Sequence, residues 1–120
     1  MPQKIIYINT NAAENPEKAT LPFMMAGAAL AMDVEAVVVL QGTGVFLAKK
    51  GYLANVPLAG SQPLAQLVTT FLEAGGRLLV CIPCLKERNL TQEDLIAEAV
   101  LTSGAALNEE ILSADATLVY

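Results

Sequence analysis

The sequence predicts one α/β domain in which helices cover both faces of a mostly parallel five-stranded sheet. Its 120 residues suit one hydrophobic core. The apolar runs are continuous rather than alternating, as in strands that are covered on both faces. These runs alternate with helical segments, and parallel strands at such spacing require crossover connections. No internal repeat or linker interrupts this pattern.

The first strand is expected over residues 4–9, a short β-branched run that ends in a polar turn. In the helix that follows, Asn15 is placed to cap the first turn, and Pro16 occupies the first helical position, where no N–H partner is needed. Apolar residues continue around this helix, so we expect a subunit contact on one of its sides. Its main apolar face consists of Ala19, Phe23, Ala26 and Leu30.

The second strand is expected over residues 35–40 and ends at the turn 41–44. A short helix over 45–50 and a loop over 51–60 follow. Ser61 is placed to cap the next helix, and a glycine pair at 75–76 ends it. That helix has the clearest apolar stripe of the chain, formed by Leu64, Leu67, Val68, Phe71 and Leu72.

The remaining elements continue the alternation. Thr91 is placed to cap a turn, across which Leu90 and Leu95 form a hydrophobic staple. Ser103 is placed to cap the last helix. The expected strands cover 77–81, 99–102 and 117–120, and the expected helices cover 82–88 and 103–114.

Composition and charge limit the partners of the chain. Hydrophobic residues make up 54% of it, charged residues 16%, and its mean hydropathy is +0.49, so we expect apolar surface to be buried between identical subunits. The net charge of -5 argues against binding to nucleic acid or to an anionic membrane surface. The longest apolar stretch, residues 21–32, is too short to cross a hydrocarbon core of about 30 Å.

The chain contains two cysteines and no histidine. The missing histidine excludes a Ser-His-Asp triad, a His-assisted thiol and the usual metal-ligand sets. A structural zinc ion takes four Cys or His ligands, which only two paired subunits could supply, so no metal is expected. The first residues lack the features of a secretory signal, and we expect a cytoplasmic protein with free thiols.

A Cys-x-x-Cys motif, formed by Cys81 and Cys84, lies where the third strand meets the next helix. A thiol at a helix N-terminus faces unpaired amides and the positive end of the helix dipole, which lower its pKa. Lys86 and Arg88 add positive charge. This placement favours Cys81 as a nucleophile. The structural alternative is a small core residue, because free cysteine is often buried.

Ligands of parallel α/β sheets bind outside the carboxyl ends of the strands, where the strand order reverses. With the order 2-1-3-4-5, this point lies between the first and third strands and brings the turn after the first strand beside Cys81. The turn residues can also serve as simple turn formers. A complete G-x-G-x-x-G or a Walker lysine is missing, so no nucleotide cofactor is expected. The candidate ligand-binding residues are Thr10, Asn11, Gly42, Thr43 and Gly44.

Several blocks of the sequence resemble the DsrE/DsrF-like proteins of sulfur metabolism, which include the TusBCD sulfur-relay subunits. The resemblance covers nearly the whole chain, and the order and spacing of the blocks carry it. The blocks are KIIYINT, ENPEKATLPFMMAGAALAMDVEAVVVL, GTGVFLAKKG, LLVCIPCLKERNL and GAALNEEILSADATLVY.

This resemblance implies a flavodoxin-like three-layer fold and assembly into homotrimers or hexamers. It also implies that the cysteine after the third strand, here Cys81, carries sulfur as a persulfide between donor and acceptor proteins. Cys84 departs from the pattern, because the relay subunits have a small residue without a thiol there. A second thiol could attack a persulfide on Cys81, releasing sulfide and leaving a disulfide, or it could be a buried bystander.

The expected function is therefore a DsrE-like sulfur carrier, sulfurtransferase-like in its chemistry, without a cofactor. One alternative is an oligomeric binding or assembly module with inert cysteines. Another is a dithiol oxidoreductase in which Cys81 and Cys84 cycle through a disulfide, although the motif of thioredoxins follows an earlier strand of a different fold. Family membership by itself supports the fold far more than the activity.

Overall fold

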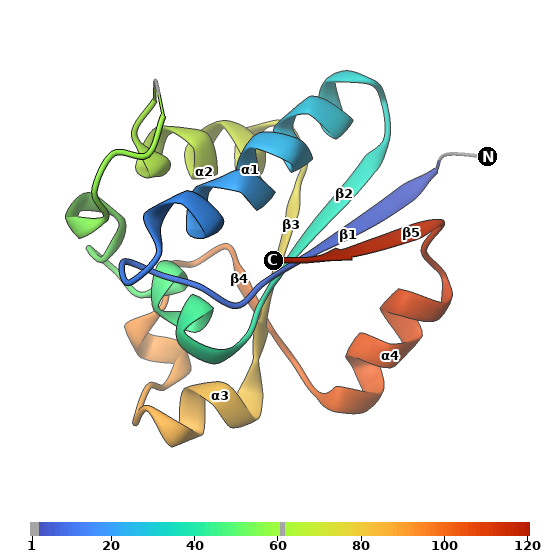
Figure 1. The fold of residues 1–120 in the computed structure, drawn as a ribbon. Coiled ribbons are helices and arrows are strands. Elements are labelled where there is room, and N and C mark those ends of the chain that lie inside the picture. Colours follow the sequence, from blue (N-terminus) through green and yellow to red (C-terminus); the bar gives the residue numbers. More distant parts are fainter. Residues whose placement is uncertain (1–2, 61) are drawn as a thin grey trace.

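A parallel sheet of five strands forms the centre of the computed structural model, which describes residues 3–60 and 62–120. The strands lie in the order β4-β3-β2-β1-β5, and every neighbouring pair is parallel (Figure 1). The continuous apolar runs of the inner strands are buried, as expected for a sheet covered on both faces. The strands are β1 (Lys4–Asn9), β2 (Glu35–Leu40), β3 (Arg77–Cys81), β4 (Ala99–Thr102) and β5 (Ala116–Val119).

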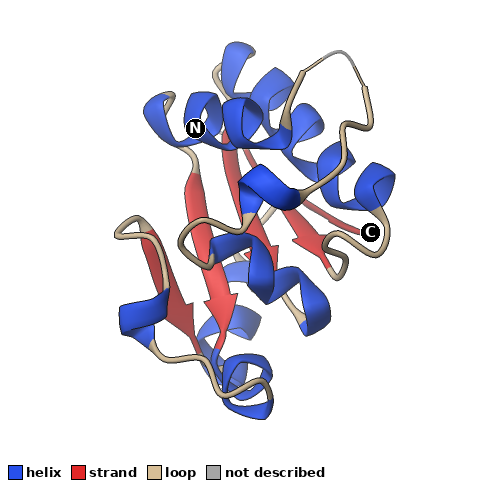
Figure 2. Cartoon of the chain, turned by 90° about the vertical axis from the view of Figure 1, so that its left-hand side faces the viewer, coloured by secondary structure: helices blue, strands red, loops and turns tan. Residues whose placement is uncertain are grey.

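Helices cover both faces of this sheet, which makes three layers (Figures 1 and 2). On one face α1 and α2 pack together, and the rings of Phe23 and Phe71 meet edge to face with centroids 5.5 Å apart. On the other face α4 places Leu107 against buried residues of β1, β2 and β3. α3 follows the carboxyl end of β3. The helices are α1 (Pro16–Ala31), α2 (Leu64–Glu73), α3 (Ile82–Glu87) and α4 (Gly104–Leu112).

The three-layer α/β fold is confirmed, but the expected strand order 2-1-3-4-5 is wrong. β2 lies between β1 and β3, because each of the first three crossovers continues in the same direction and only β5 returns to the far side of β1. The local sequence pattern that defines each strand does not encode the side on which the next strand is laid. Thr10 and Asn11, which follow β1, are therefore separated from Cys81 by the end of β2.

The expected caps that fall on described residues are present. The Asn15 carboxamide oxygen accepts a hydrogen bond from the Lys18 amide at 3.2 Å, and the Ser103 hydroxyl accepts one from the Ala106 amide at 3.1 Å. Thr91 forms a capping box with its third following residue, Asp94. Ser61 lies outside the described residues. α2 begins at Leu64 without a side-chain cap from the residue before it.

Four segments are described in more detail by the structure than by the sequence. The segment expected as a helix over 45–50 is a 3₁₀ helix, η1 (Gly42–Ala48), which begins directly after β2. The loop over 51–60 contains a further 3₁₀ turn, η2 (Leu53–Asn55). A third, η3 (Gln92–Asp94), carries the capping box. The last strand begins and ends one residue earlier than expected.

Large apolar side chains remain exposed on the outer side of α1 and along β5, which is an edge strand. This agrees with the apolar excess of the composition. The exposed residues of these two elements are Leu21, Met24, Met25, Leu118 and Val119. Among the described residues, no helix is long and apolar enough to cross a membrane.

Candidate functional site

Cys81 is the last residue of β3 and the residue directly before α3. It pairs in register with Thr102, the last residue of β4, so both lie at the carboxyl edge of the sheet. Its side chain packs against the core cluster beneath α1 and α2, and it also lines a cavity beside the start of α4. The side chain is half-buried, and its sulfur forms no disulfide. The expectation of free thiols at both cysteines is confirmed.

A small cavity of about 80 Å³ opens beside Cys81, between the ends of β3 and β4 and the start of α4. Its volume suits a small molecule or a few atoms of a larger one. One polar group of its wall, the side chain of Thr102, is buried. The lining residues are Gln41, Cys81, Pro83, Thr102, Ser103, Gly104 and Leu107.

The N-terminus of α4 forms one wall of this cavity. The Ser103 hydroxyl and carbonyl oxygens accept hydrogen bonds from the amides of Ala106 and Leu107. The two preceding amides, of Gly104 and Ala105, have no acceptor within a helix. Such amides and the positive end of the helix dipole favour an anion. The cavity therefore combines a thiol with a wall that suits negative charge.

The electrostatic state of Cys81 differs from expectation. Burial and a hydrogen bond with the Cys84 thiol raise the pKa of Cys81 above its ordinary value, and the carboxylate of Glu87 acts in the same direction. The Cys84 backbone amide at the start of α3 lowers this pKa, as predicted for a helix N-terminus, but its effect is smaller. The expected net lowering is wrong, because the sequence pattern did not reveal how much water the thiol loses. Cys81 is mainly a thiol at neutral pH.

Cys84 lies one helical turn further on and packs against the core cluster beneath α1 and α2. Its sulfur accepts a hydrogen bond from the Gly42 amide at 3.3 Å. Gly42 has a φ of 56°, which a residue with a side chain rarely adopts, and this conformation aims the amide at the thiol. The Cys84 carbonyl oxygen accepts a hydrogen bond from the Arg88 guanidinium at 3.0 Å. The loop after β2 is thus joined to the second thiol.

The other candidate ligand-binding residues mainly hold this edge of the sheet together. The Thr10 hydroxyl donates a hydrogen bond to the Tyr120 carbonyl at 2.6 Å, and the Asn11 amide donates one to the buried Asn9 side chain. The Thr43 hydroxyl contacts both the Thr10 carbonyl and the Glu14 carboxylate. These contacts fit the reading of Thr10 and Asn11 as turn formers. The structure joins Gly42 to Cys84, and it does not place Thr10 or Asn11 in the cavity beside Cys81.

Gly44 closes the same loop tightly against β1. A Cβ atom at this position would collide with the Asn9 carbonyl oxygen, so only glycine fits without a shift of the backbone. The Gly-Thr-Gly turn therefore serves close packing between the ends of β1 and β2.

Sequence reasoning missed Gln41, Thr102 and Leu107 as parts of the site. The position of Thr102 could have been found, because it ends the strand next to β3 once the order is known. Leu107 is a core residue by its apolar character and reaches the cavity only through the placement of α4. Within residues 3–60 and 62–120, no group of three or more Cys, Asp or Glu side chains is arranged to hold a metal ion.

A family comparison matches residues 3–120 to the DsrE/DsrF-like family. Two curated relatives from Methanocaldococcus jannaschii are both described as uncharacterized proteins. MJ0989 is 34% identical over 101 residues, which are 83% of this chain and 84% of that protein. MJ0760 is 33% identical over 92 residues, which are 77% of this chain but 34% of that protein, so this chain spans about a third of its length.

Two solved structures share the fold. The crystal structure of the ychN protein from E. coli superimposes with a TM-score of 0.82 at 18% identity, over 98% of this chain and 99% of that one. The protein of unknown function MTH1491 from Methanobacterium thermoautotrophicum gives a TM-score of 0.73 at 14% identity, over the full length of both chains. At these identities the likeness concerns the fold alone.

Proposed function

Because this chain belongs to the DsrE/DsrF-like family, we propose that it is an intracellular sulfur carrier that holds a persulfide on Cys81. One observation carries the proposal: the half-buried Cys81 thiol lines a small cavity whose opposite wall is the N-terminus of α4. Family membership alone would not justify a role for this residue. The cavity provides space for a sulfur atom bound to Cys81, and the amides of its wall favour negative charge on that atom.

In the loading step, the Cys81 thiolate attacks the outer sulfur of a donor persulfide. A sulfur–sulfur bond forms at Cys81, the donor's sulfur–sulfur bond breaks, and the donor leaves as a thiolate. In the unloading step, an acceptor thiolate attacks the outer sulfur on Cys81 and restores the Cys81 thiolate. Both steps are thiol–disulfide exchanges, so no external oxidant is needed.

The surroundings of Cys81 suit the loaded state better than the empty state. The raised pKa keeps the empty site protonated at neutral pH, which limits reaction with unrelated electrophiles. A persulfide extends one atom further than the thiol into the cavity, whose lining includes Gly104, the first residue of α4. Negative charge on the outer sulfur is then stabilised by the α4 N-terminus. These features support storage of sulfane sulfur in a reducing compartment such as the cytoplasm.

The carrier function can be tested with the reduced full chain and a small persulfide donor. We expect intact-mass spectrometry to detect one added sulfur atom on the wild type and none on Cys81→Ser. Incubation of the loaded protein with glutathione should move that sulfur to the small thiol. Wild-type protein that gains no sulfur, or a Cys81→Ser variant that loads equally, would contradict the proposal.

A second candidate function is a binding or assembly module in which the cysteines are inert. The raised pKa of Cys81 favours this alternative, because a protonated thiol is a poor nucleophile. Alkylation rates distinguish the two functions. A carrier requires that Cys81 reacts faster as the pH rises through its pKa, whereas an inert site stays unreactive even in alkaline solution.

We also propose that the chain associates with copies of itself through its exposed apolar residues. Met24 and Met25 on α1 and Leu118 and Val119 on β5 are between 42% and 69% exposed, which is unfavourable for large side chains in water. In a single chain, the outer edge of β5 also leaves backbone N–H and C=O groups without a neighbouring strand. Light scattering that gives the 12.6 kDa mass of one chain at micromolar concentration would contradict self-association.

A further inference from the structure

The second thiol of the motif lies beside Cys81 but not in the cavity. Cys84 packs against the core cluster beneath α1 and α2, whereas the cavity lies toward α4. Cys81 is near both, because its sulfur contacts the Cys84 thiol and also lines the cavity. The outer sulfur of a persulfide on Cys81 can therefore occupy the cavity, which Cys84 does not line.

Cys84 also has a hydrogen-bond donor fixed beside its sulfur. The Gly42 amide donates a hydrogen bond to the Cys84 sulfur at 3.3 Å, and the left-handed backbone of Gly42 holds that amide in place. The Arg88 guanidinium on the Cys84 carbonyl oxygen fixes the same turn of α3. Cys84 is therefore a positioned thiol rather than a loose side chain.

We propose that Cys84 discharges the Cys81 persulfide as sulfide when no acceptor thiol takes the sulfur. This inference rests on the proposed loading of Cys81. The Cys84 thiolate attacks the inner sulfur of the persulfide, which is the Cys81 sulfur itself.

The step is balanced within the protein. A Cys81–Cys84 bond forms with the electron pair of the Cys84 thiolate, and the bond between Cys81 and the outer sulfur breaks. The outer sulfur keeps that bonding pair, takes up the proton released by the Cys84 thiol, and leaves through the cavity as hydrosulfide. The sulfane sulfur is reduced to sulfide, and the two cysteines are oxidised to a disulfide.

A dithiol reductant must then reduce the disulfide before Cys81 can be loaded again. The disulfide blocks Cys81, so a reducing dithiol has to attack it and leave as a disulfide of its own. The motif would thus limit the lifetime of an undelivered persulfide and link reuse of the carrier to the supply of dithiol.

The test follows the loaded protein after the donor has been removed on a desalting column. Wild type and Cys84→Ser are loaded with the same small persulfide donor, and free sulfide and intact mass are recorded over time. We expect the wild type to release its added sulfur as sulfide and to become lighter than the reduced chain by two hydrogen atoms. In Cys84→Ser the added sulfur should persist at least about tenfold longer. Cys84→Ala, checked by circular dichroism, serves if the serine variant folds poorly.

The outcomes separate this inference from the carrier function. If both proteins load and lose sulfur at the same rate, or if sulfide appears without a Cys81–Cys84 disulfide, the role of Cys84 is wrong and the carrier function stands. If neither protein loads, the carrier function fails first. Addition of dithiothreitol to the discharged wild type should restore its capacity to load, whereas a site that stays blocked would overturn the proposed reset.

Discussion

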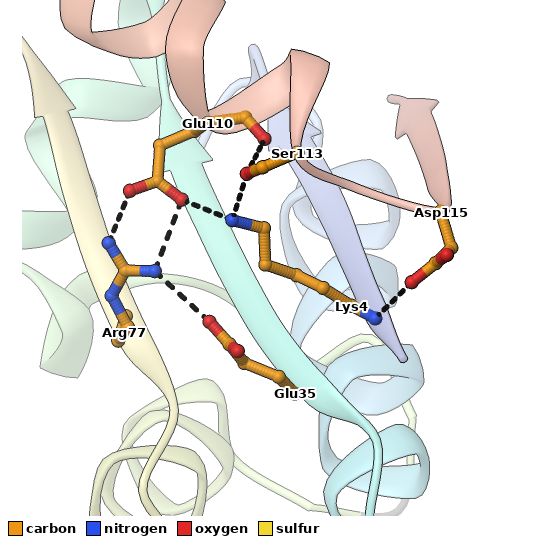
Figure 3. A network of polar contacts seen from close by, with 6 residues as sticks. All are labelled: Lys4, Glu35, Arg77, Glu110, Ser113 and Asp115. Carbon is orange, nitrogen blue, oxygen red and sulfur yellow. Dashed lines mark hydrogen bonds and ion pairs between the residues drawn. The ribbon is translucent and has the colours of Figure 1, made fainter. Parts of the chain in front are cut away.

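The two ends of the sheet are built from different chemistry. At the amino ends of β1, β2 and β3, charged side chains form a closed network with α4 (Figure 3). At the carboxyl ends, the groups around Cys81 are a second thiol, hydroxyls and backbone amides. The first end neutralises its charges within the protein. The second end leaves amides free and can therefore receive a negative charge from outside.

Glu110 is the centre of the network at the amino end. Its carboxylate accepts hydrogen bonds from Lys4 at 2.8 Å and from Arg77 at 2.5 and 3.1 Å, and Arg77 also contacts Glu35 at 3.2 Å. The Lys4 ammonium further donates to the Ser113 hydroxyl at 2.6 Å. Hydrogen bonds from Arg77 and Lys4 lower the pKa of Glu110 to about 2. This network holds the C-terminal end of α4, whose N-terminal end forms the wall beside Cys81.

α4 contributes to both ends of the sheet. α4 is held at one end by ion pairs, and at the other it offers amides that have no partner within the helix. Stability is therefore expected to depend most on the tight loop packing and on the network, and reactivity on the groups near Cys81.

The largest loss of stability is expected for Gly44→Ala. The added Cβ would meet the Asn9 carbonyl oxygen at the carboxyl edge, so the backbone of one strand end must move. We expect the free energy of unfolding in urea to fall by about 3 kcal/mol. The matched control is Gly27→Ala in α1, where a Cβ meets nothing within 4 Å and alanine should add about 0.5–1 kcal/mol. Equal stability of the two variants would contradict the tight approach at Gly44.

At the opposite end, Glu110→Gln should lower the free energy of unfolding by about 2 kcal/mol at neutral pH. The pKa of Glu110 is lower in the folded than in the unfolded chain, so its contribution is present above the unfolded pKa and is lost on acidification. The difference from wild type should therefore vanish between about pH 5 and pH 2. Glu109→Gln, one residue away on the exposed side of α4, is the control. A difference that persists at pH 2 would rule out this origin.

Removal of the α4 cap should affect both stability and chemistry. Ser103→Ala deprives the Ala106 amide of its acceptor and is expected to cost about 1 kcal/mol in urea unfolding. Asn15→Ala removes the equivalent cap of α1 and should cost a similar amount. Loading of Cys81 should slow by about two- to fivefold in Ser103→Ala and stay unchanged in Asn15→Ala. Equal loading rates in both variants would exclude a role for the α4 N-terminus.

The smallest effect is expected for the reactivity of Cys81 in Cys84→Ala. This change removes two causes that raise the pKa of Cys81, the hydrogen bond and the coulombic interaction with the Cys84 side chain, and keeps the backbone amide that lowers it. Iodoacetamide should therefore label Cys81 about two- to fivefold faster at neutral pH, and the two proteins should converge in alkaline solution. Slower labelling would show that Cys84 activates Cys81 instead.

Much of the fold was predictable because its signals are local. The apolar runs gave the strands, and Asn15, Thr91 and Ser103 marked the starts of their elements correctly. The strand order was not predictable from such signals, because it depends on the side to which each crossover turns. That error moved Thr10 and Asn11 next to Cys81, where the structure instead has the end of β2.

The place of Cys81 in the fold was predictable, but its surroundings were not. The end of an apolar strand followed by a short helix located Cys81 at the carboxyl edge. The direction of its pKa depends on burial and on the Cys84 thiol, which are set by long-range packing and are not visible in the spacing of the motif. The cavity depends equally on α4, which lies more than twenty residues further along the chain.

The central claim is that the transferred sulfur is bound to the Sγ atom of Cys81. The most direct measurement is tandem mass spectrometry of the reduced wild-type chain after a brief exposure to a persulfide donor, with alkylation to trap the product and with Cys84→Ser as the second sample. We expect the trapped extra sulfur to lie on Cys81 in both proteins. Extra sulfur confined to Cys84 in the wild type, or found on neither cysteine, would contradict it.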